Sequence, residues 1–380
     1  MTRKSIKASS YIFAYRFVDW FRRAVGIARR PRILIDCMAP FHYHHVKPIV
    51  DRLVEDGKVD VSVLETQRFR SEPRNEALIS PAHFIRHSRA RLSGFDMTIS
   101  TDLHVTYLPQ RGFEVYAPHG AGMKSSYATG AMIAHFGAAF VVGKRREEAQ
   151  LSNRVSDTKF IKTGFVIAET PTPSAFRMAE MREQLGLRRD LPVVLYAPSW
   201  SSNLELILFS EEILKVLASQ PYWNVIVRPH PNLLVPELCG GVRWIEIIGK
   251  YCRPGFSLAD DPREPAQSFM HLSDAIVGDF SSILFEFLFF DRPIVVHVAH
   301  RAVNYFGGQD ALEEIGPAAT CFEDVTDVVS TIEVALSQKE HLSPARRALL
   351  NERYFNVGTA TATAVDFIYQ QLSVSRGSSE

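Results

Sequence analysis

From residue 31 onward, short apolar runs alternate with longer stretches whose apolar residues recur every three or four positions. A short apolar run between polar turns predicts a buried strand, and the longer spacing predicts an amphipathic helix. The strands expected in the first half are Arg32–Cys37, Val59–Leu64, Met97–Ser100, Val115–Ala117, Ala139–Val142 and Phe160–Lys162. Those expected in the second half are Val193–Tyr196, Val225–Val227, Trp244–Ile247, Ala275–Val277 and Ile294–Val296. Strands that alternate with helices predict an α/β protein with doubly wound parallel sheets.

The length of the chain predicts more than one domain, because 380 residues are many for a single hydrophobic core. The clearest linker is the Thr-Pro-Thr-Pro-Ser stretch at residues 170–174. We therefore expect a basic amphipathic helix at residues 1–30 and a Rossmann-like domain at 31–169. A second Rossmann-like domain is expected at 170–360, followed by a C-terminal helix and polar tail at 361–380.

Composition and charge are those of a globular cytoplasmic protein. Apolar residues make up 46% of the chain and charged residues 22%, and the net charge of +1 gives no reason to expect a nucleic-acid partner. The cysteines are scattered without a Cys-x-x-Cys pair, so neither a zinc site nor a disulfide framework is expected. We expect a protein that uses no metal or cofactor and works in a reducing cytoplasm.

Residues Tyr11–Arg30 combine aromatic and aliphatic side chains with five arginines. At helical spacing this places a Phe and Trp stripe beside a cationic face, which is typical of a helix lying in a membrane interface. Packing of the same helix on its own domain is an equally open interpretation. No apolar run reaches the roughly eighteen residues that a spanning helix needs. We therefore expect a peripheral protein that contacts the anionic inner face of the plasma membrane.

The most informative stretch is residues 274–296. It predicts a buried strand, a turn that opens with Gly278-Asp279, a helix with Ser281 and Ser282 in its first turn, and a second strand. Unpaired N–H groups and the positive end of the helix dipole make such a helix start a seat for phosphate, and serine hydroxyls add donors. The alternative is that Asp279 or Ser281 only caps the helix.

Two other expected strands end in the same kind of polar loop, one at Ser199 and the other at Arg228 and His230. In an open parallel sheet, ligands bind where strands end, so the three ends together describe one anion-binding site. Prolines on both sides of His230 hold its loop extended. A core histidine is the alternative for His230 alone, and the neighbouring Arg228 makes that interpretation the weaker one.

These motifs resemble those of the CDP-glycerol glycerophosphotransferase family, which includes teichoic-acid and capsule polyol-phosphate transferases. The Arg-x-His-Pro and Tyr-Ala-Pro-Thr-Trp elements of that family correspond to residues 228–231 and 196–200. Its Asp-Tyr-Ser-Ser element corresponds to residues 279–282, followed by Glu286. Its His-Gly-Thr-Pro-Leu-Lys loop corresponds to residues 119–124, where Ala-Gly replaces Thr-Pro. Four elements in the same order are a specific signal.

The resemblance implies a GT-B-like fold, in which two Rossmann-like domains face a cleft. It also implies a phosphotransferase that moves a polyol phosphate, glycerol phosphate or similar, from a CDP-linked donor. A hydroxyl of a glycan or lipid-linked acceptor attacks the β-phosphorus, and CMP leaves. The product would be a teichoic-acid or capsule polymer of the cell envelope.

The resemblance also assigns roles to matching residues. His119 becomes the favoured general base, because an imidazole accepts a proton near neutral pH. Gly120 lets the backbone approach a substrate, and Lys124 neutralises phosphate. Asp279 is expected to orient His230 or to cap the helix. The residues expected to bind the donor phosphates are Ser199, Arg228, His230, Ser281 and Ser282, with His230 also counted as catalytic.

Glu286 is expected to accept a hydrogen bond from a ribose hydroxyl, with a surface glutamate as the open alternative.

A further cluster, His42, His44 and His45, follows the first strand. Its spacing does not make the imidazoles converge on an ion, so no metal site is expected. In GT-B enzymes the loop after the first strand faces the cleft, so one of the three, with His45 as the candidate, is expected to contact the acceptor. Asp102 and His104 are expected to line the same cleft.

Two other functions stay open at this point. A nucleotide-sugar glycosyltransferase or epimerase of the same fold also holds a diphosphate at the start of a helix. A noncatalytic binding relative in polysaccharide assembly is favoured by the altered Ala121-Gly122 pair. The Arg-Pro-His-Pro element together with the His-Gly loop favours phosphotransfer.

Overall fold

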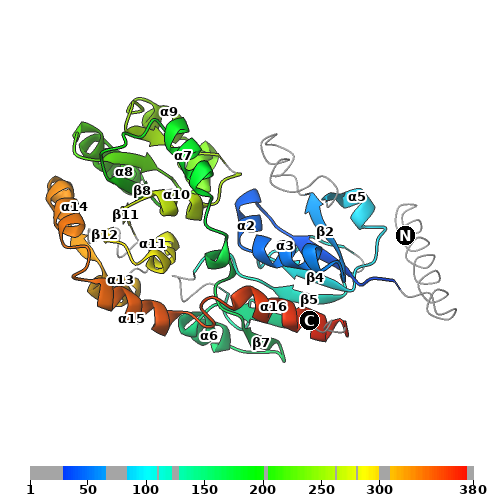
Figure 1. The fold of residues 1–380 in the computed structure, drawn as a ribbon. Helices are drawn as coiled ribbons and strands as arrows, with labels where there is room; N and C mark the ends of the chain where they lie inside the picture. The colour runs from blue at the N-terminus through cyan, green and yellow to red at the C-terminus, as the bar shows by residue number, and fades with distance from the viewer. Residues whose placement is uncertain are drawn as a thin grey trace. The chain divides into compact units, whose positions relative to one another are not determined.

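The computed structural model describes residues 29–65, 84–108, 111–121, 128–200, 204–261, 263–279, 281–298 and 309–374. The chain forms two compact units (Figure 1). The first comprises Met1–His119, Ser125–Glu169 and Tyr354–Glu380, and the second comprises Gly120–Lys124 and Thr170–Arg353. The chain returns to the first unit at Tyr354, before the domain end expected at residue 360.

The first unit is built on a seven-stranded sheet in the order β3-β2-β1-β4-β5-β6-β7, with every neighbouring pair parallel. The order reverses between β1 and β4, which is the switch point where ligands bind in open α/β sheets. The strands are β1 (Arg32–Asp36), β2 (Asp60–Glu65), β3 (Phe84–Arg86), β4 (Met97–Ser100), β5 (Phe113–Tyr116), β6 (Ala138–Val141) and β7 (Lys159–Lys162).

Helices cover this sheet, and two of them, α3 and α16, pack on each other and on the same apolar core. Helix α3 has a proline in its first turn and ends at Gly57 in the left-handed conformation, a common pair of helix start and stop signals. Helix α16 buries Ala364, Val365 and Ile368 in the core. The helices are α2 (Pro40–His44), α3 (Lys47–Asp56), α5 (His87–Ala90), α6 (Lys144–Leu151), the 3₁₀ turn η3 (Val166–Glu169) and α16 (Ala360–Gln371).

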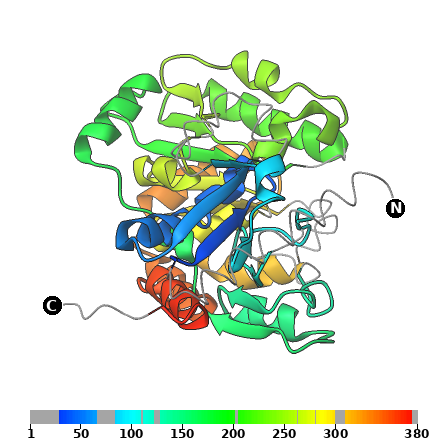
Figure 2. The same cartoon turned by 90° about the vertical axis from the view of Figure 1, so that its right-hand side faces the viewer.

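Helix α16 completes the first unit, although most of the chain between β7 and α16 belongs to the second one (Figures 1 and 2). The carboxylate of Glu169 accepts the backbone N–H groups of Ala360 and Thr361, which satisfies donors at the start of α16. Gly164, at a φ of +91°, lies so close to the returning chain that a Cβ there would sit 2.2 Å from the carbonyl oxygen of Phe355.

The second unit has a six-stranded parallel sheet in the order β10-β9-β8-β11-β12-β13. Its switch point lies between β8 and β11, whose residues are all buried. The strands are β8 (Val193–Ala197), β9 (Asn224–Val227), β10 (Phe256–Leu258), β11 (Ala275–Gly278), β12 (Ile294–His297) and β13 (Thr320–Phe322).

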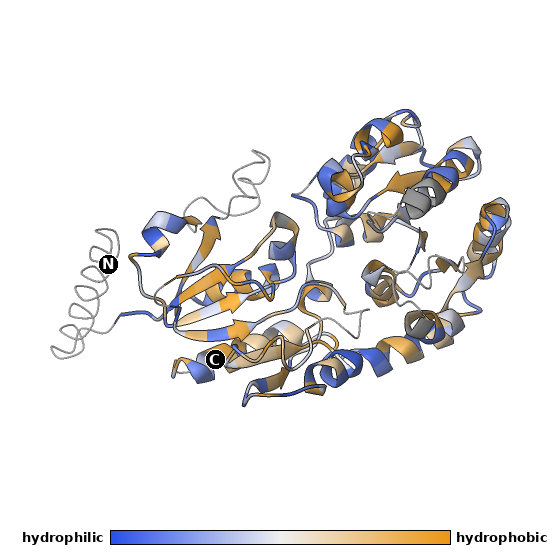
Figure 3. Cartoon of the chain, turned by 180° about the vertical axis from the view of Figure 1, so that it is seen from behind, coloured by the Kyte–Doolittle hydropathy of each residue, from blue (hydrophilic) through white to orange (hydrophobic). Residues whose placement is uncertain are grey.

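The α-helices of the second unit flank this sheet (Figure 1). They are α7 (Ala175–Gln184), α8 (Leu204–Ser219), α9 (Trp244–Gly249), α10 (Ala266–Leu272), α11 (Ser282–Phe287), α13 (Gln309–Ile315), α14 (Val328–Ser337) and α15 (Ser343–Arg353). Short 3₁₀ turns include η4 (Pro231–Leu234) after β9 and η6 (Leu288–Phe290) after α11. Coloured by hydropathy, the strands are mostly orange and the helices alternate orange with blue (Figure 3). This is expected when the strands form the core and each helix has one solvent-exposed face.

The expected α/β class with doubly wound parallel sheets is confirmed. The strand expected at Trp244–Ile247 is wrong, because these residues form helix α9. Trp244 and Ile248, four residues apart, are buried, whereas Ile245 is exposed. That spacing is helical, and a short apolar run does not distinguish the two states. The short strands β3, β10 and β13 are absent from the sequence-based expectation.

Within the described ranges, no helix has both the length and the apolar character needed to cross a membrane. The amphipathic helix expected at residues 1–30 lies outside the described residues except for Arg29 and Arg30. Arg29 forms an ion pair with Asp96, with 2.6 Å between Nη1 and Oδ2. This arginine is therefore tied to the first unit.

Candidate active site

The loops that follow β8 and β11 are joined by a hydrogen bond at the switch point of the second sheet. The backbone N–H of Ser199 donates to Oδ2 of Asp279 at 3.0 Å. Asp279 is partly buried, and desolvation raises the pKa of its carboxyl group. Its Oδ1 atom is also buried and accepts no hydrogen bond from the described residues. The sequence motifs that contain Ser199 and Asp279 therefore meet at one sheet edge, as expected.

The start of helix α11 carries no side-chain cap. Ser281 occupies the N-cap position, and neither its hydroxyl nor any other described side chain accepts from the first turn. The bonds of the Asp279 side chain go to Ser199, so the expectation that Asp279 caps this helix is not met. Ser281 and Ser282 lie at the carboxyl end of β11, next to N–H groups that a ligand can use.

Glu286 lies one turn into α11 with its carboxyl group buried. Nε2 of Gln267 donates to one oxygen at 2.9 Å, and the hydroxyl of Ser282 donates weakly to the other at 3.5 Å. Burial raises the pKa of Glu286 to about 8. At neutral pH the group is therefore mostly the neutral acid. The sequence did not point to Gln267, because an isolated glutamine carries no motif.

His230 follows β9 and begins the 3₁₀ turn η4. Its Nδ1 accepts the backbone N–H of Asn232 at 3.1 Å, so in the neutral ring the proton is on Nε2. The indole of Trp200 lies 6.0 Å from it, between ring centroids. His230 thus presents an N–H donor, the group that phosphate binding requires.

Arg228, next to His230, is partly buried, and its guanidinium donates to backbone carbonyls. Nη1 donates to the carbonyl of Ala259 at 2.7 Å and to that of Asp261 at 3.3 Å, and Nη2 donates to that of Glu264 at 2.9 Å. Burial lowers the pKa of the guanidinium to about 10. These bonds use three of the five N–H groups of the guanidinium, so the contact with donor phosphate expected from the sequence would use the Nε–H or the second Nη2–H. The geometry suits Arg228 as a brace for residues 259–264.

In the first unit, His119 follows β5 and lies beside the switch point. Its Nδ1 is 2.6 Å from the carbonyl oxygen of Thr101, which follows β4. A carbonyl only accepts, so Nδ1 carries the proton and Nε2 is the basic atom. Burial lowers the pKa of His119, and the carboxylate of Asp102 opposes that shift. His119 is thus a neutral imidazole with a fixed tautomer, which suits a general base.

The ring of His42 stacks on that of His119, with 3.8 Å between centroids and 13° between planes. Of the cluster expected after the first strand, His42 is therefore the member that contacts His119. The side chain of His45 lies further away, 6.4 Å between centroids. Ligand atoms of His42, Asp102 and His119 lie within 4.8 Å of one another. Because the two imidazole planes are nearly parallel, their in-plane lone pairs do not converge on one ion, and the rings would have to turn before both ligated it.

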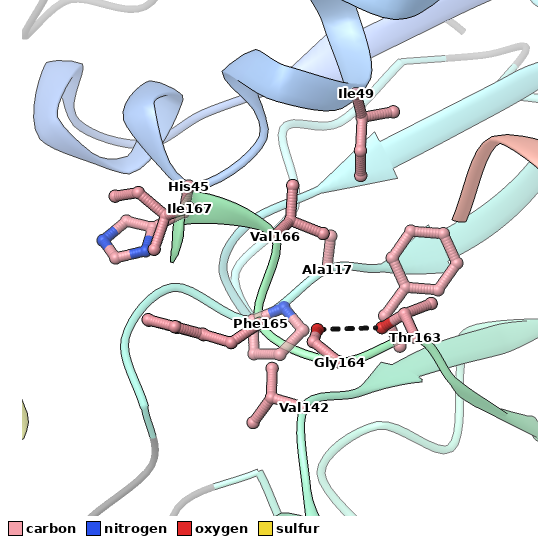
Figure 4. A pocket seen from close by; sticks show the side chains of 11 residues that line it. His45, Ile49, Ala117, Val142, Thr163, Gly164, Phe165, Val166 and Ile167 are labelled. Atoms are coloured by element: carbon pink, nitrogen blue, oxygen red, sulfur yellow. Dashed lines mark hydrogen bonds between the residues drawn. The ribbon is translucent and has the colours of Figure 1, made fainter. Parts of the chain in front are cut away.

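His45 lines a small apolar pocket at the carboxyl edge of the first sheet (Figure 4). The pocket is lined by Ala117 after β5, Val142 after β6, and the segment Thr163–Ile167 after β7. Burial and the neighbouring histidines His119 and His44 lower the pKa of His45 well below its usual value, so it is neutral. His45 therefore offers a neutral hydrogen-bonding ring beside apolar surface. Asp102 and His104 follow β4, and the backbone N–H of His104 donates to Asp102 at 3.1 Å.

Residues Gly120–Lys124, directly after His119, belong to the second unit. Gly120 has a φ of +77°, and a Cβ placed on it would lie 3.3 Å from Oγ of Ser282. A side chain at this position would be strained and would crowd Ser282. The carbonyl of Ala121 accepts from Arg353 at 3.2 Å. Lys124 lies outside the described residues.

The family model that describes the CDP-Glycerol:Poly(glycerophosphate) glycerophosphotransferases matches residues 167–368, just over half of the chain. This chain therefore belongs to that family, as the sequence motifs predicted. A curated relative is the teichoic acid poly(glycerol phosphate) polymerase of Bacillus spizizenii, which is 28% identical over 130 residues. That match covers 32% of this chain and only 30% of the relative.

Solved structures with the same fold include the wall teichoic acid polymerase TagF. It has a TM-score of 0.66 at 12% identity over 97% of this chain and 98% of that one. A TagF variant soaked with CDPG also has a TM-score of 0.66, at 13% identity over 98% and 97% of the two chains. A putative UDP-N-acetylglucosamine 2-epimerase from Listeria monocytogenes scores 0.60 at 14% identity over 92% and 98%. These likenesses confirm the expected GT-B-like fold.

Proposed function

We propose that this protein transfers a polyol phosphate, glycerol phosphate or a close relative, from a CDP-linked donor to a hydroxyl of a glycan or lipid-linked acceptor. The observation that carries the proposal is the meeting of the β8, β9 and β11 loops at one switch point, with Ser199 bonded to Asp279. All of these residues fall inside the stretch that matches the family model. Support also comes from TagF, a protein of the same fold that was soaked with CDPG.

The donor side of the reaction uses the second unit. We assign the diphosphate to the hydroxyls of Ser281 and Ser282, the N–H groups that open α11, and the Nε2–H of His230. Ser199 completes the set through the loop that Asp279 holds. Catalysis of phosphoryl transfer depends on positioning and fixed donors, because charge spreads over the transferring and departing phosphates. Neutral Glu286 avoids placing an anion beside these phosphates.

The acceptor side uses the first unit. His119 takes the proton of the acceptor hydroxyl on Nε2 while its Nδ1–H stays bonded to Thr101. The acceptor oxygen forms a bond to the β-phosphorus, the bond from that phosphorus to the bridging oxygen breaks, and CMP leaves with the electron pair. His45 and the apolar surface of Phe165 are assigned to the acceptor itself.

A panel of donors tests this assignment. Purified protein is incubated with CDP-glycerol, CDP-ribitol, CMP-sugars and UDP-N-acetylglucosamine, with and without a lipid-linked acceptor, and nucleotide release is measured. Release of CMP from a CDP-polyol that depends on the acceptor is the expected result. Turnover of UDP-N-acetylglucosamine instead would support an epimerase, the function after which the Listeria protein of the same fold is named. Tight binding of CDP-glycerol with no CMP release would identify a noncatalytic relative.

A further inference from the structure

Arg353, the last residue of α15, joins three elements of the second unit with one buried side chain. Only 2% of that side chain is exposed. Its guanidinium stacks on the ring of Phe285 in α11, 3.7 Å from the ring centroid. It pairs with the carboxylate of Glu314 in α13, and Nη2 donates to the carbonyl of Ala121 at 3.2 Å. One planar cation therefore holds α11, α13 and the loop that follows His119.

The loop contact has a consequence for His119, since Ala121 lies only two residues later in the chain. Consecutive Cα atoms are about 3.8 Å apart, so a fixed Ala121 limits how far the backbone of His119 can move. Gly120, between them, lies against Ser282 at the start of α11. The same helix supplies Phe285 to Arg353 one turn later. Arg353 thus connects the loop that follows His119 to helix α11, which carries Ser282.

The family's Thr-Pro pair is replaced here by Ala121-Gly122, so the loop lacks both a proline restraint and a threonine hydroxyl. The hydrogen bond from Arg353 to the carbonyl of Ala121 supplies a restraint on the described part of the loop. Arginine suits this task because its planar fork makes a stacking contact, an ion pair and a backbone hydrogen bond at once.

We propose that Arg353 is a positioning residue for the chain that follows His119: it anchors the carbonyl of Ala121 on α11 and α13 and so restrains the backbone two residues after the base. This proposal rests on the proposed function, because the gain is in turnover. It assigns Arg353 no contact with donor or acceptor. Loss of the anchor is expected to lower kcat by about 10- to 100-fold, since small misplacements of a catalytic group have effects of this size. Donor affinity is expected to change little.

The chain offers a matched control in Arg346, which lies on the same helix and is equally buried. Arg346 bonds to Asp291 and to the carbonyl of Lys339, and within the described residues these bonds do not involve the loop that follows His119. Arg353→Gln, Arg353→Lys and Arg346→Gln are compared with the parent. Three quantities are measured: kcat and KM with a CDP-polyol donor, CDP affinity by calorimetry, and deuterium uptake of a peptide spanning residues 115–130. Thermal unfolding reports the general cost of losing a buried arginine.

The expected result is that Arg353→Gln lowers kcat, keeps CDP affinity within about threefold, and speeds deuterium uptake of the loop peptide. The kcat of Arg353→Lys is expected to lie between those of Arg353→Gln and the parent. A lysine ammonium is a point charge, which cannot stack on a ring while it also pairs with a carboxylate and donates to a carbonyl. Arg346→Gln is expected to lower only the melting temperature. The proposal is overturned if both Gln variants lose kcat equally, or if Arg353→Gln keeps parental kcat. If the parent itself transfers nothing, the proposed function fails, and unchanged uptake in Arg353→Gln would separately refute the anchor.

Discussion

At the scale of single residues, hydrogen bonds decide which atom of each histidine can react. The carbonyl of Thr101 fixes the proton of His119 on Nδ1, and the N–H of Asn232 fixes that of His230 on Nε2. One ring is therefore a base and the other a donor, although the sequence presents two similar histidines. The types of these residues were predictable from motifs, whereas their tautomers depend on backbone groups from other strands and loops.

We predict that His119→Gln retains CDP binding and loses turnover by roughly 10²–10⁴-fold, the usual contribution of a general base. Because the pKa of His119 is lowered, the acid limb of the parental pH profile is expected below pH 6.5. Activity falls there because the base becomes protonated. His341→Gln, at an exposed histidine that is not among the proposed site residues, serves as control. Parallel loss of binding and rate would instead make His119 a phosphate ligand.

Glu286 gives a second prediction at this scale, from a carboxyl whose pKa is raised to about 8 by burial. The folded protein then holds a proton that the unfolded chain releases near pH 4.5, so this group makes stability fall as pH rises from about 4.5 to about 8. Above pH 8 the new carboxylate also repels donor phosphate, so CDP affinity is expected to fall. Glu286→Gln should flatten both trends. Identical pH profiles of melting temperature and CDP affinity in parent and variant would contradict this.

At the scale of elements, the strand ends were predictable because parallel sheets place polar loops at one edge. The residues to which these loops bond were not predictable from the sequence. The sequence predicts Arg228 as a phosphate ligand, which stays a prediction, and gives no sign of its bonds to a segment more than thirty residues later. Helix α9 shows the same limit, since the choice between strand and helix for Trp244–Ile247 depends on which residues meet the core.

We predict that Arg228→Gln lowers the free energy of unfolding by about 1–3 kcal/mol, because it leaves the partly buried carbonyls of Ala259, Asp261 and Glu264 without these donors. The measurement is chemical denaturation with and without CDP. If Arg228 braces the loop, the variant is less stable in both conditions and CDP still stabilises it. Arg263→Gln, at an exposed arginine in the same loop, should change stability by less than about 0.5 kcal/mol. A variant with parental stability that ignores CDP would show that Arg228 is a ligand after all.

At the scale of the whole molecule, the return of the chain to the first unit could not be read from the sequence. Helix α16 follows the second unit closely in the chain, and its contacts with α3 and β7 and its capping by Glu169 assign it to the first. Local patterns predict elements, but they carry no information on which of two cores a late helix completes. The two sheets themselves were predictable because each arises from consecutive strands and helices.

The last prediction concerns residues 1–28, for which membrane attachment remains our proposal. Arg29 is bound to Asp96, so it belongs to the fold, and a deletion that ends at residue 28 keeps this ion pair. The full chain is expected to bind vesicles of phosphatidylcholine and phosphatidylglycerol, less in high salt and not when the vesicles are neutral. Each cation near such a surface contributes about 1 kcal/mol, so replacing Arg16, Arg22 and Arg23 by Gln should weaken binding roughly 100-fold.

The shortened protein should lose vesicle binding yet stay folded and still bind CDP, because the donor loops and both cores lie within residues 29–374. Attachment of the full chain would then hold the enzyme beside a lipid-linked acceptor, which links its location to its choice of substrate. If the intact protein ignores anionic vesicles, the arginines serve another purpose. If the shortened protein unfolds, the segment packs on the first unit, and its apolar stripe belongs to the core rather than to a lipid surface.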